Sequence, residues 1–186
     1  MYLIVDNYDS FTYNLYTLFF NIGVDCKVVK NDAPLIEEPS LKGIIISPGP
    51  SHPSKSLNSI KYIDKYKGRL PILGVCLGMQ TICFNQGYTI RRSKLIRHGK
   101  VDKVRKIKDS LILKGIDNEF EVVRYHSLVV EADDDYVTSR SICDNEAMSF
   151  EDRDLLLFGV QFHPESFLSK NGKIIAKNFI DICEGY

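Results

Sequence analysis

Surplus charge and long apolar runs are both missing from this sequence. Its 24 lysine and arginine residues balance 24 aspartate and glutamate residues, which leaves no basic surplus for a nucleic-acid footprint. No apolar run reaches the roughly 18 residues that a membrane-spanning helix needs. These two absences predict a protein that uses neither nucleic acid nor a membrane as a partner.

Paired cysteines are missing as well. The five cysteines are odd in number and widely spaced, and no Cys-x-x-Cys motif occurs, which argues against a disulfide framework or a zinc site. Residues 1–6 lack the basic stretch of a signal peptide and predict a first strand, so we expect a cytoplasmic location. Four of the cysteines are expected to be small buried apolar residues: Cys26, Cys83, Cys143 and Cys183.

The first half of the chain shows the patterning of an α/β fold. With 186 residues, 44% of them hydrophobic and 26% charged, the chain is long enough for one sizeable core. Short apolar runs alternate with segments whose apolar residues have helical spacing, which predicts a parallel sheet. The expected strands are 3–5, 25–29, 43–47 and 71–75, and the expected helices are 10–22, 54–66 and 78–86.

The second half has a different pattern. After Gly87 the apolar period falls toward two, which predicts additional short strands, and the three aspartates at 133–135 predict a turn. The fold class is therefore α/β, a single domain over residues 1–186 with a mixed, mostly parallel sheet flanked by helices. The expected strands are 119–123, 128–132, 137–142, 147–150 and 155–162, and the expected helix is 173–183.

A basic segment between residues 100 and 108 admits two interpretations. In the plainer one, its cations cover the solvent face of a strand whose Val101, Val104 and Ile107 point inward. In the other, the cations form a docking surface; the plainer interpretation is favoured for most of the lysines. The cations are Lys100, Lys103, Arg105, Lys106 and Lys108.

The most informative motif is Gly-x-Cys-x-Gly, centred on Cys76 between an apolar strand and a helix. This is the cysteine counterpart of a nucleophile elbow, a sharp turn that strains its middle residue above the sheet. Gly74 and Gly78 permit close approach to adjacent backbone, and the helix N-terminus stabilises a thiolate. A buried structural cysteine is the alternative, but the symmetric glycines at this junction favour a nucleophile. The backbone N–H of Leu77 is a candidate oxyanion donor.

A thiolate nucleophile usually needs a histidine, and that histidine needs an orienting group. Among four histidines, only His163 ends an apolar strand with a carboxylate close by, at Glu165. Residues two apart in extended chain point to the same side, and Pro164 favours extended backbone at His163. Parallel strands end at the same edge of a sheet, so His163 can reach Cys76 there. The alternative is that this histidine and glutamate lie at a strand end without a catalytic role. The presence of Cys76 makes that alternative the less favoured one.

A Pro-Gly-Pro loop follows another apolar strand, with Gly49 at its centre. The stiff loop leaves the backbone accessible, so the Gly49 N–H is a candidate second oxyanion donor. Taken alone, this segment would be an ordinary turn.

With these residues in view, the chain resembles the class I (triad) glutamine amidotransferases. Within them it resembles the small subunits of anthranilate synthase and aminodeoxychorismate synthase. The resemblance covers nearly the whole chain, and its order and spacing make it highly specific. The motifs that carry it lie at 6–14, 47–50, 74–80, 98–100, 124–129 and 159–166.

The resemblance implies a flavodoxin-like fold and a role for each matching residue. Cys76 would be the nucleophile, His163 the base and acid, and Glu165 the group that orients it. Gly49 and Leu77 would donate N–H groups to the oxyanion. The substrate, L-glutamine, would be bound by Gly49, Pro50, Ser51, Gln80, Ser127 and Leu128.

The resemblance also implies a heteromeric partner, a chorismate-binding synthase subunit that receives the ammonia. Magnesium would belong to that partner, with no metal or cofactor in this chain. Residues 98–100 and 9–10 resemble surfaces that face the synthase. Whether the product is anthranilate, 4-amino-4-deoxychorismate or both stays open. Other hypotheses are a stand-alone cysteine hydrolase, a silent binding subunit, and an amidotransferase with a different partner.

Two positions depart from the pattern of the family. Ser51 stands where a glycine is usual, and Met79 stands where a histidine is usual. Met79 is expected to pack inward as a helix residue. Neither change removes a member of the expected triad, so we expect activity to survive with a modified glutamine pocket.

Overall fold

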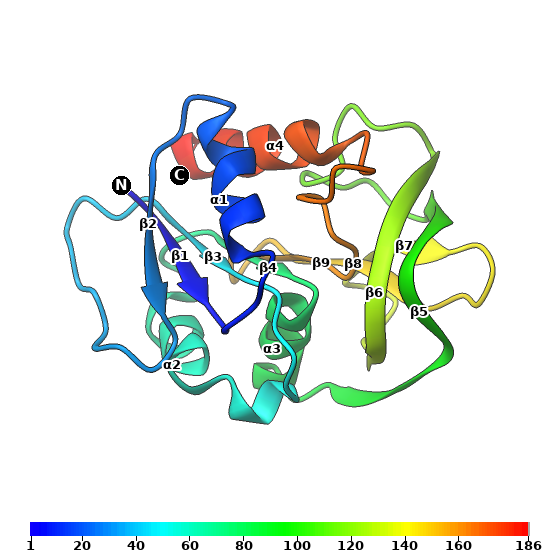
Figure 1. The fold of residues 1–186 in the computed structure, drawn as a ribbon, viewed down its shortest axis with the longest axis horizontal. Helices are drawn as coiled ribbons and strands as arrows, with labels where there is room; N and C mark the ends of the chain where they lie inside the picture. The colour runs from blue at the N-terminus through cyan, green and yellow to red at the C-terminus, as the bar shows by residue number, and fades with distance from the viewer. Residues whose placement is uncertain (186) are drawn as a thin grey trace.

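The computed structural model describes residues 1–185, without the side chains of residues 97 and 98. One sheet runs through the molecule in the strand order β2-β1-β3-β4-β9-β8-β7-β5-β6. Helices α1 and α4 cover one face of its parallel half, and α2 and α3 cover the other (Figure 1). The strands are β1 (Tyr2–Asp6), β2 (Cys26–Lys30), β3 (Gly43–Ile46), β4 (Ile72–Val75), β5 (Thr89–Lys106), β6 (Glu119–Glu131), β7 (Val137–Ser141), β8 (Ala147–Asp152) and β9 (Leu157–Val160). The helices are α1 (Thr12–Phe20), α2 (Leu57–Tyr66), α3 (Leu77–Asn85) and α4 (Gly172–Glu184), with a 3-10 turn at Pro53–Lys55.

The parallel half of the sheet is buried on both faces, and its sequence shows why. In β1, Tyr2 and Ile4 point into the core beneath α1 and α4. Leu3 and Val5 point into the opposite core, against α2 and α3. Because side chains alternate along a strand, a strand covered by helices on both sides needs apolar residues at every position. The expected strands and helices of this half are all present, with ends shifted by a few residues.

The sheet is mixed, as expected. Strands β2, β1, β3, β4 and β9 run parallel, and β9, β8, β7, β5 and β6 pair antiparallel to their neighbours. The long β5–β6 hairpin stands at the end of the molecule away from α2 (Figure 1). Among residues 1–185, no helix is long and apolar enough to cross a bilayer.

Three local expectations were wrong. The two strands expected at 119–123 and 128–132 are one strand, β6, because the long β5 pairs with both parts of it. Of the three residues expected to point inward from the basic segment, only Val104 is buried, while Val101 and Ile107 are exposed, because alternate residues of a strand face opposite sides and a spacing of three cannot share one face. Cys143 is exposed instead of buried, because it lies in the turn that joins β7 to β8.

Candidate active site

Cys76 occupies the turn between β4 and α3, with the strained backbone expected of an elbow. Its dihedral angles are φ 53° and ψ −105°, a region that residues with a side chain rarely adopt. The two glycines are required by close packing. A Cβ atom on Gly74 would lie 2.3 Å from the carbonyl carbon of Gly78, and one on Gly78 would lie 2.2 Å from the carbonyl oxygen of Ile46. The turn therefore presses against its own first helical turn and against β3.

His163 reaches the same edge of the sheet because β9 lies beside β4 in parallel, with Val75 opposite Val160. Its N–H donates to the carbonyl of Val123 at 3.0 Å, which fixes the backbone beyond the end of β9. His163 Nδ1 lies 2.5 Å from Glu165 Oε1, and both side chains are buried. The structure thus forms the histidine–glutamate pair that the spacing of two residues predicts.

The charge environment of His163 favours the imidazolium. Burial lowers the pKa of His163, but the charges of Cys76 and Glu165 and the hydrogen bond to Glu165 outweigh burial and hold it well above its usual value. The ring's other nitrogen, Nε2, is buried and has no hydrogen-bond partner among residues 1–185. Nε2 is therefore the ring nitrogen available to exchange a proton with the Cys76 sulfur, since Nδ1 is bonded to the Glu165 carboxylate.

Two aromatic rings cover the imidazole. Phe11 and Tyr125 place their ring centroids 5.7 Å and 5.4 Å from that of His163, both edge-on. Phe11 also contacts Tyr125, with 5.5 Å between centroids. This cover limits the access of water to His163, which strengthens the electrostatic interactions around it.

A cavity of about 230 Å3 opens beside Cys76. It brings together all of the substrate-binding residues expected from the sequence. Tyr125 and His126 complete its lining, and neither was expected there. The lining residues are Gly49, Pro50, Ser51, Cys76, Gln80, Tyr125, His126, Ser127 and Leu128.

Of the two expected oxyanion donors, Gly49 lines this cavity and Leu77 directly follows Cys76, which lines it. Leu77 is the first residue of α3, where backbone N–H groups have no partner within the helix. Gly49 lines the cavity, and a Cβ atom there would lie 2.5 Å from the Leu77 side chain and 2.8 Å from Cβ of Asn7. Only glycine therefore lets the loop after β3 approach Leu77 this closely.

The two departures from the family pattern have different environments. Ser51 is exposed at the rim of the cavity. Met79 is fully buried, as expected, and a Cβ atom on Gly159 would lie 2.7 Å from its side chain. Met79 therefore fills the space between α3 and β9 and stays out of the cavity lining.

A buried polar network behind the cavity was not foreseen. The fully buried Arg124 of β6 forms ion pairs with Asp102 of β5, at 2.5 Å, and with Asp144 in the β7–β8 turn, at 2.9 Å. Arg124 Nε also donates to His126 Nε2 at 2.9 Å. The spacing of two between Arg124 and His126 was the available signal, because it places two polar side chains on one face of a strand.

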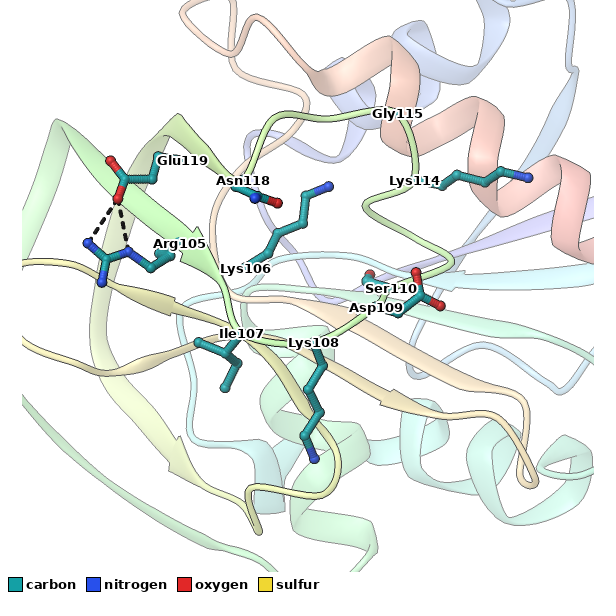
Figure 2. A pocket seen from close by; sticks show the side chains of 10 residues that line it. All are labelled: Arg105, Lys106, Ile107, Lys108, Asp109, Ser110, Lys114, Gly115, Asn118 and Glu119. Carbon is teal, nitrogen blue, oxygen red and sulfur yellow. Dashed lines mark hydrogen bonds and ion pairs between the residues drawn. The ribbon is translucent and has the colours of Figure 1, made fainter.

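A larger cavity, about 590 Å3, lies away from Cys76, between the end of β5 and the loop before β6 (Figure 2). Arg105 at its edge is paired with Glu119. Figure 2 shows Lys106, Lys108 and Lys114 pointing in three different directions. Because these cations do not converge, the cavity lacks the converging polar groups of a binding site. The side chain of His98, expected at a partner-facing surface, lies outside the described residues.

Comparisons with known proteins identify related sequences and structures. A profile of the glutamine amidotransferase class-I family matches residues 3–183. The chain is 43% identical to aminodeoxychorismate synthase component 2 of Escherichia coli, over 97% of this chain and 99% of the relative. It is 40% identical to anthranilate synthase component 2 of Thermus thermophilus, over 96% and 91%.

Among solved structures, a putative GMP synthase subunit from Thermoplasma acidophilum superposes with a TM-score of 0.89 at 29% identity, covering all of this chain and 94% of that one. The match to the family profile spans nearly the whole chain and includes every residue of the elbow, the histidine–glutamate pair and the cavity. This chain belongs to the class-I glutamine amidotransferase family.

Proposed function

We propose that this chain is a glutaminase subunit that hydrolyses glutamine to glutamate and ammonia through Cys76, His163 and Glu165. The observation that carries this proposal is the meeting of a strained Cys76 with the buried His163–Glu165 pair beside a small cavity. A raised pKa of His163 supports an imidazolium beside a thiolate as the resting state. Glu165 orients the ring by holding Nδ1.

The reaction has two halves. The Cys76 thiolate attacks the side-chain carbonyl carbon of glutamine, and the N–H groups of Gly49 and Leu77 stabilise the oxyanion. The imidazolium of His163 gives its proton to the departing ammonia, which leaves a γ-glutamyl thioester. His163, now neutral, takes a proton from water, the resulting hydroxide attacks the thioester, and glutamate leaves as the thiolate returns. Pro50, Ser51, Gln80, Ser127 and Leu128 hold the substrate in the cavity.

We further propose that the ammonia passes to a chorismate-using synthase subunit that makes anthranilate, 4-amino-4-deoxychorismate or both. Relatives named for both synthases support this partner class, and their similar identities leave the choice between the two open. Ammonia in bulk water becomes ammonium, which is not nucleophilic, so direct transfer to a partner suits the chemistry. Any magnesium would belong to the partner.

Cys76→Ser tests the nucleophile. In the complex with the synthase subunit, this variant should lose glutamine-dependent synthesis and keep synthesis from added ammonium salts. Glutamine-dependent synthesis that survives would show that Cys76 is not the nucleophile. Labelling with an electrophilic glutamine analogue should modify Cys76, and excess glutamine should suppress the label.

A second candidate differs in its partner. The similarity to a putative GMP synthase subunit makes a GMP synthase the second candidate for the ammonia acceptor. Affinity capture on the tagged chain separates the two candidates, since a chorismate-using synthase and a GMP synthase differ in mass and in substrate. Glutaminase activity of the chain should rise when its true partner is added.

A further inference from the structure

The side-chain amide of Gln161 is a polar neighbour of the Cys76 sulfur, in addition to the imidazole of His163. Gln161 follows β9, is fully buried, and places its Nε2 atom 3.6 Å from Cys76 Sγ. We propose that Gln161 is a further catalytic residue, whose side-chain amide donates an N–H to the Cys76 sulfur and stabilises the thiolate. This inference rests on the proposed function, because that thiolate is the proposed nucleophile.

The hydrogen bonds fix which end of the Gln161 amide faces the sulfur. The carbonyl oxygen of Leu128 can only accept, so the Gln80 atom 2.9 Å from it must be the amide nitrogen, Nε2. That nitrogen also donates to Gln161, at 3.1 Å, so the Gln161 atom facing it must be the carbonyl oxygen. The NH2 group of Gln161 is therefore turned toward Cys76, and flipping it would place two donors against each other.

The carbonyl oxygen of Leu128 is also held in place by His126. His126 Nδ1 lies 3.0 Å from the Leu128 oxygen, and His126 Nε2 accepts from Arg124 Nε. This arrangement needs a neutral ring with its proton on Nδ1, and burial together with the Arg124 charge lowers the pKa of His126 to about 4. The Leu128 oxygen is thus anchored to the buried ion pairs of Arg124 with Asp102 and Asp144.

A neutral amide has chemical advantages at this position. Cys76 is only 6% exposed, so its thiolate has lost most of the water that would solvate it. A donor held in place replaces part of that solvation, as hydrogen bonds to a charged group favour the charged form. Unlike His163, an amide cannot protonate the sulfur, so Gln161 can stabilise the nucleophile at every stage without quenching it. Both N–H groups of Gln80 are engaged, which leaves the Gln80 carbonyl oxygen for the substrate.

Gln161→Met removes the donor and keeps a side chain of similar length. The measurement is the rate of Cys76 alkylation by iodoacetamide as a function of pH, followed by peptide mapping because the chain has five cysteines. In Gln161→Met, the pH of half-maximal alkylation should rise by about one unit. Gln161→Glu, which has the same shape, should raise it further, because a carboxylate repels the thiolate. The matched control is Gln86→Met, in which the lost amide bonds Asn85, and its profile should equal that of the parent chain.

One outcome would overturn the inference, namely alkylation profiles of Gln161→Met and Gln161→Glu that both overlap that of the parent chain. If glutaminase kcat falls in both variants while these profiles stay unchanged, Gln161 is a structural residue only. Thermal unfolding of each variant shows that it is folded, and Gln161→Glu carries the test if Gln161→Met does not fold. A Cys76→Ser variant that keeps glutaminase activity would refute the proposed function while leaving the alkylation result to decide on Gln161.

Discussion

The backbone strain at Cys76 predicts that Cys76→Gly, which removes the side chain, is more stable than Cys76→Ala, which shortens it. At φ 53° and ψ −105° a Cβ atom is in an unfavourable position, which costs about 1–3 kcal/mol. Cys76→Ala keeps the Cβ and the strain, whereas Cys76→Gly removes both. Glycine also has greater freedom in the unfolded chain, which costs about 0.5–1 kcal/mol. We expect the glycine variant to exceed the alanine variant by about 1 kcal/mol in free energy of unfolding, or roughly 2–4 °C in Tm.

Cys83 provides the matched control for this comparison. It lies inside α3, fully buried, with helical backbone. The same two substitutions there should give the opposite order, with glycine less stable than alanine by about 1 kcal/mol. Urea unfolding of the four variants measures both differences. If Cys76→Gly falls below Cys76→Ala by the amount seen at Cys83, the backbone at Cys76 is not strained and the argument is refuted.

The site and its surroundings give three more predictions. Gly78→Ala should lower the free energy of unfolding by more than about 3 kcal/mol, because the new Cβ would lie 2.2 Å from the Ile46 carbonyl oxygen. Urea unfolding measures this loss, and a value below about 1 kcal/mol would contradict the close packing at Gly78. Cys76→Ala should lower the pKa of His163, since it removes the thiolate charge, and an unchanged imidazole titration by NMR would show that the two groups are not coupled. Arg124→Leu should cost about 3–5 kcal/mol at pH 7, because two buried aspartates lose their cation.

The pH dependence of the Arg124 prediction has a definite sign. Burial raises the pKa values of Asp102 and Asp144, but the Arg124 guanidinium outweighs burial and holds both below their usual value. A carboxylate with a depressed pKa contributes stability that is present above its unfolded pKa, near 4, and is lost as the pH falls through its folded pKa. The difference between the parent chain and Arg124→Leu should therefore shrink as the pH falls below about 4. A difference that stays constant down to pH 3 would count against the ion pairs as its source.

The parallel half of the fold could be predicted because its sequence is constrained at every position. Strands such as β3 and β4 are apolar throughout because helices cover both faces, and the glycines of the elbow have contacts that no side chain could tolerate. The pairing of His163 with Glu165 was predicted from the alternation of an extended chain, whereas the structure forms it in a turn in which the Ser166 N–H donates to the His163 carbonyl. The positions of Cys76 and His163 at one sheet edge followed from the rule that parallel strands share a direction.

The antiparallel half was harder to predict for physical reasons. Strands β5 and β6 are covered on parts of their length only, so burial changes along them and the apolar pattern gives no regular period. The inward direction of Asp102 depends on a partner, Arg124, that comes from another strand, and no local pattern indicates it. Gln161 could have been identified from the sequence as a candidate site residue, since it precedes His163 by two residues, as His163 precedes Glu165. The position of its amide depends on Gln80 and Leu128, which only the folded chain brings together.

Strand β9 comes last in the chain but lies in the interior of the sheet, between β4 and β8 (Figure 1). Until it inserts, the parallel and antiparallel halves each end in an open interior edge, and such edges invite pairing with other chains. Insertion must bring together segments far apart in sequence, which makes it a slow step of folding. The same step carries His163 to Cys76, so the proposed nucleophile and base meet only when the sheet closes. A partly folded chain therefore has exposed edges and no assembled hydrolytic pair, and completion of the sheet and onset of thiol reactivity should coincide in time.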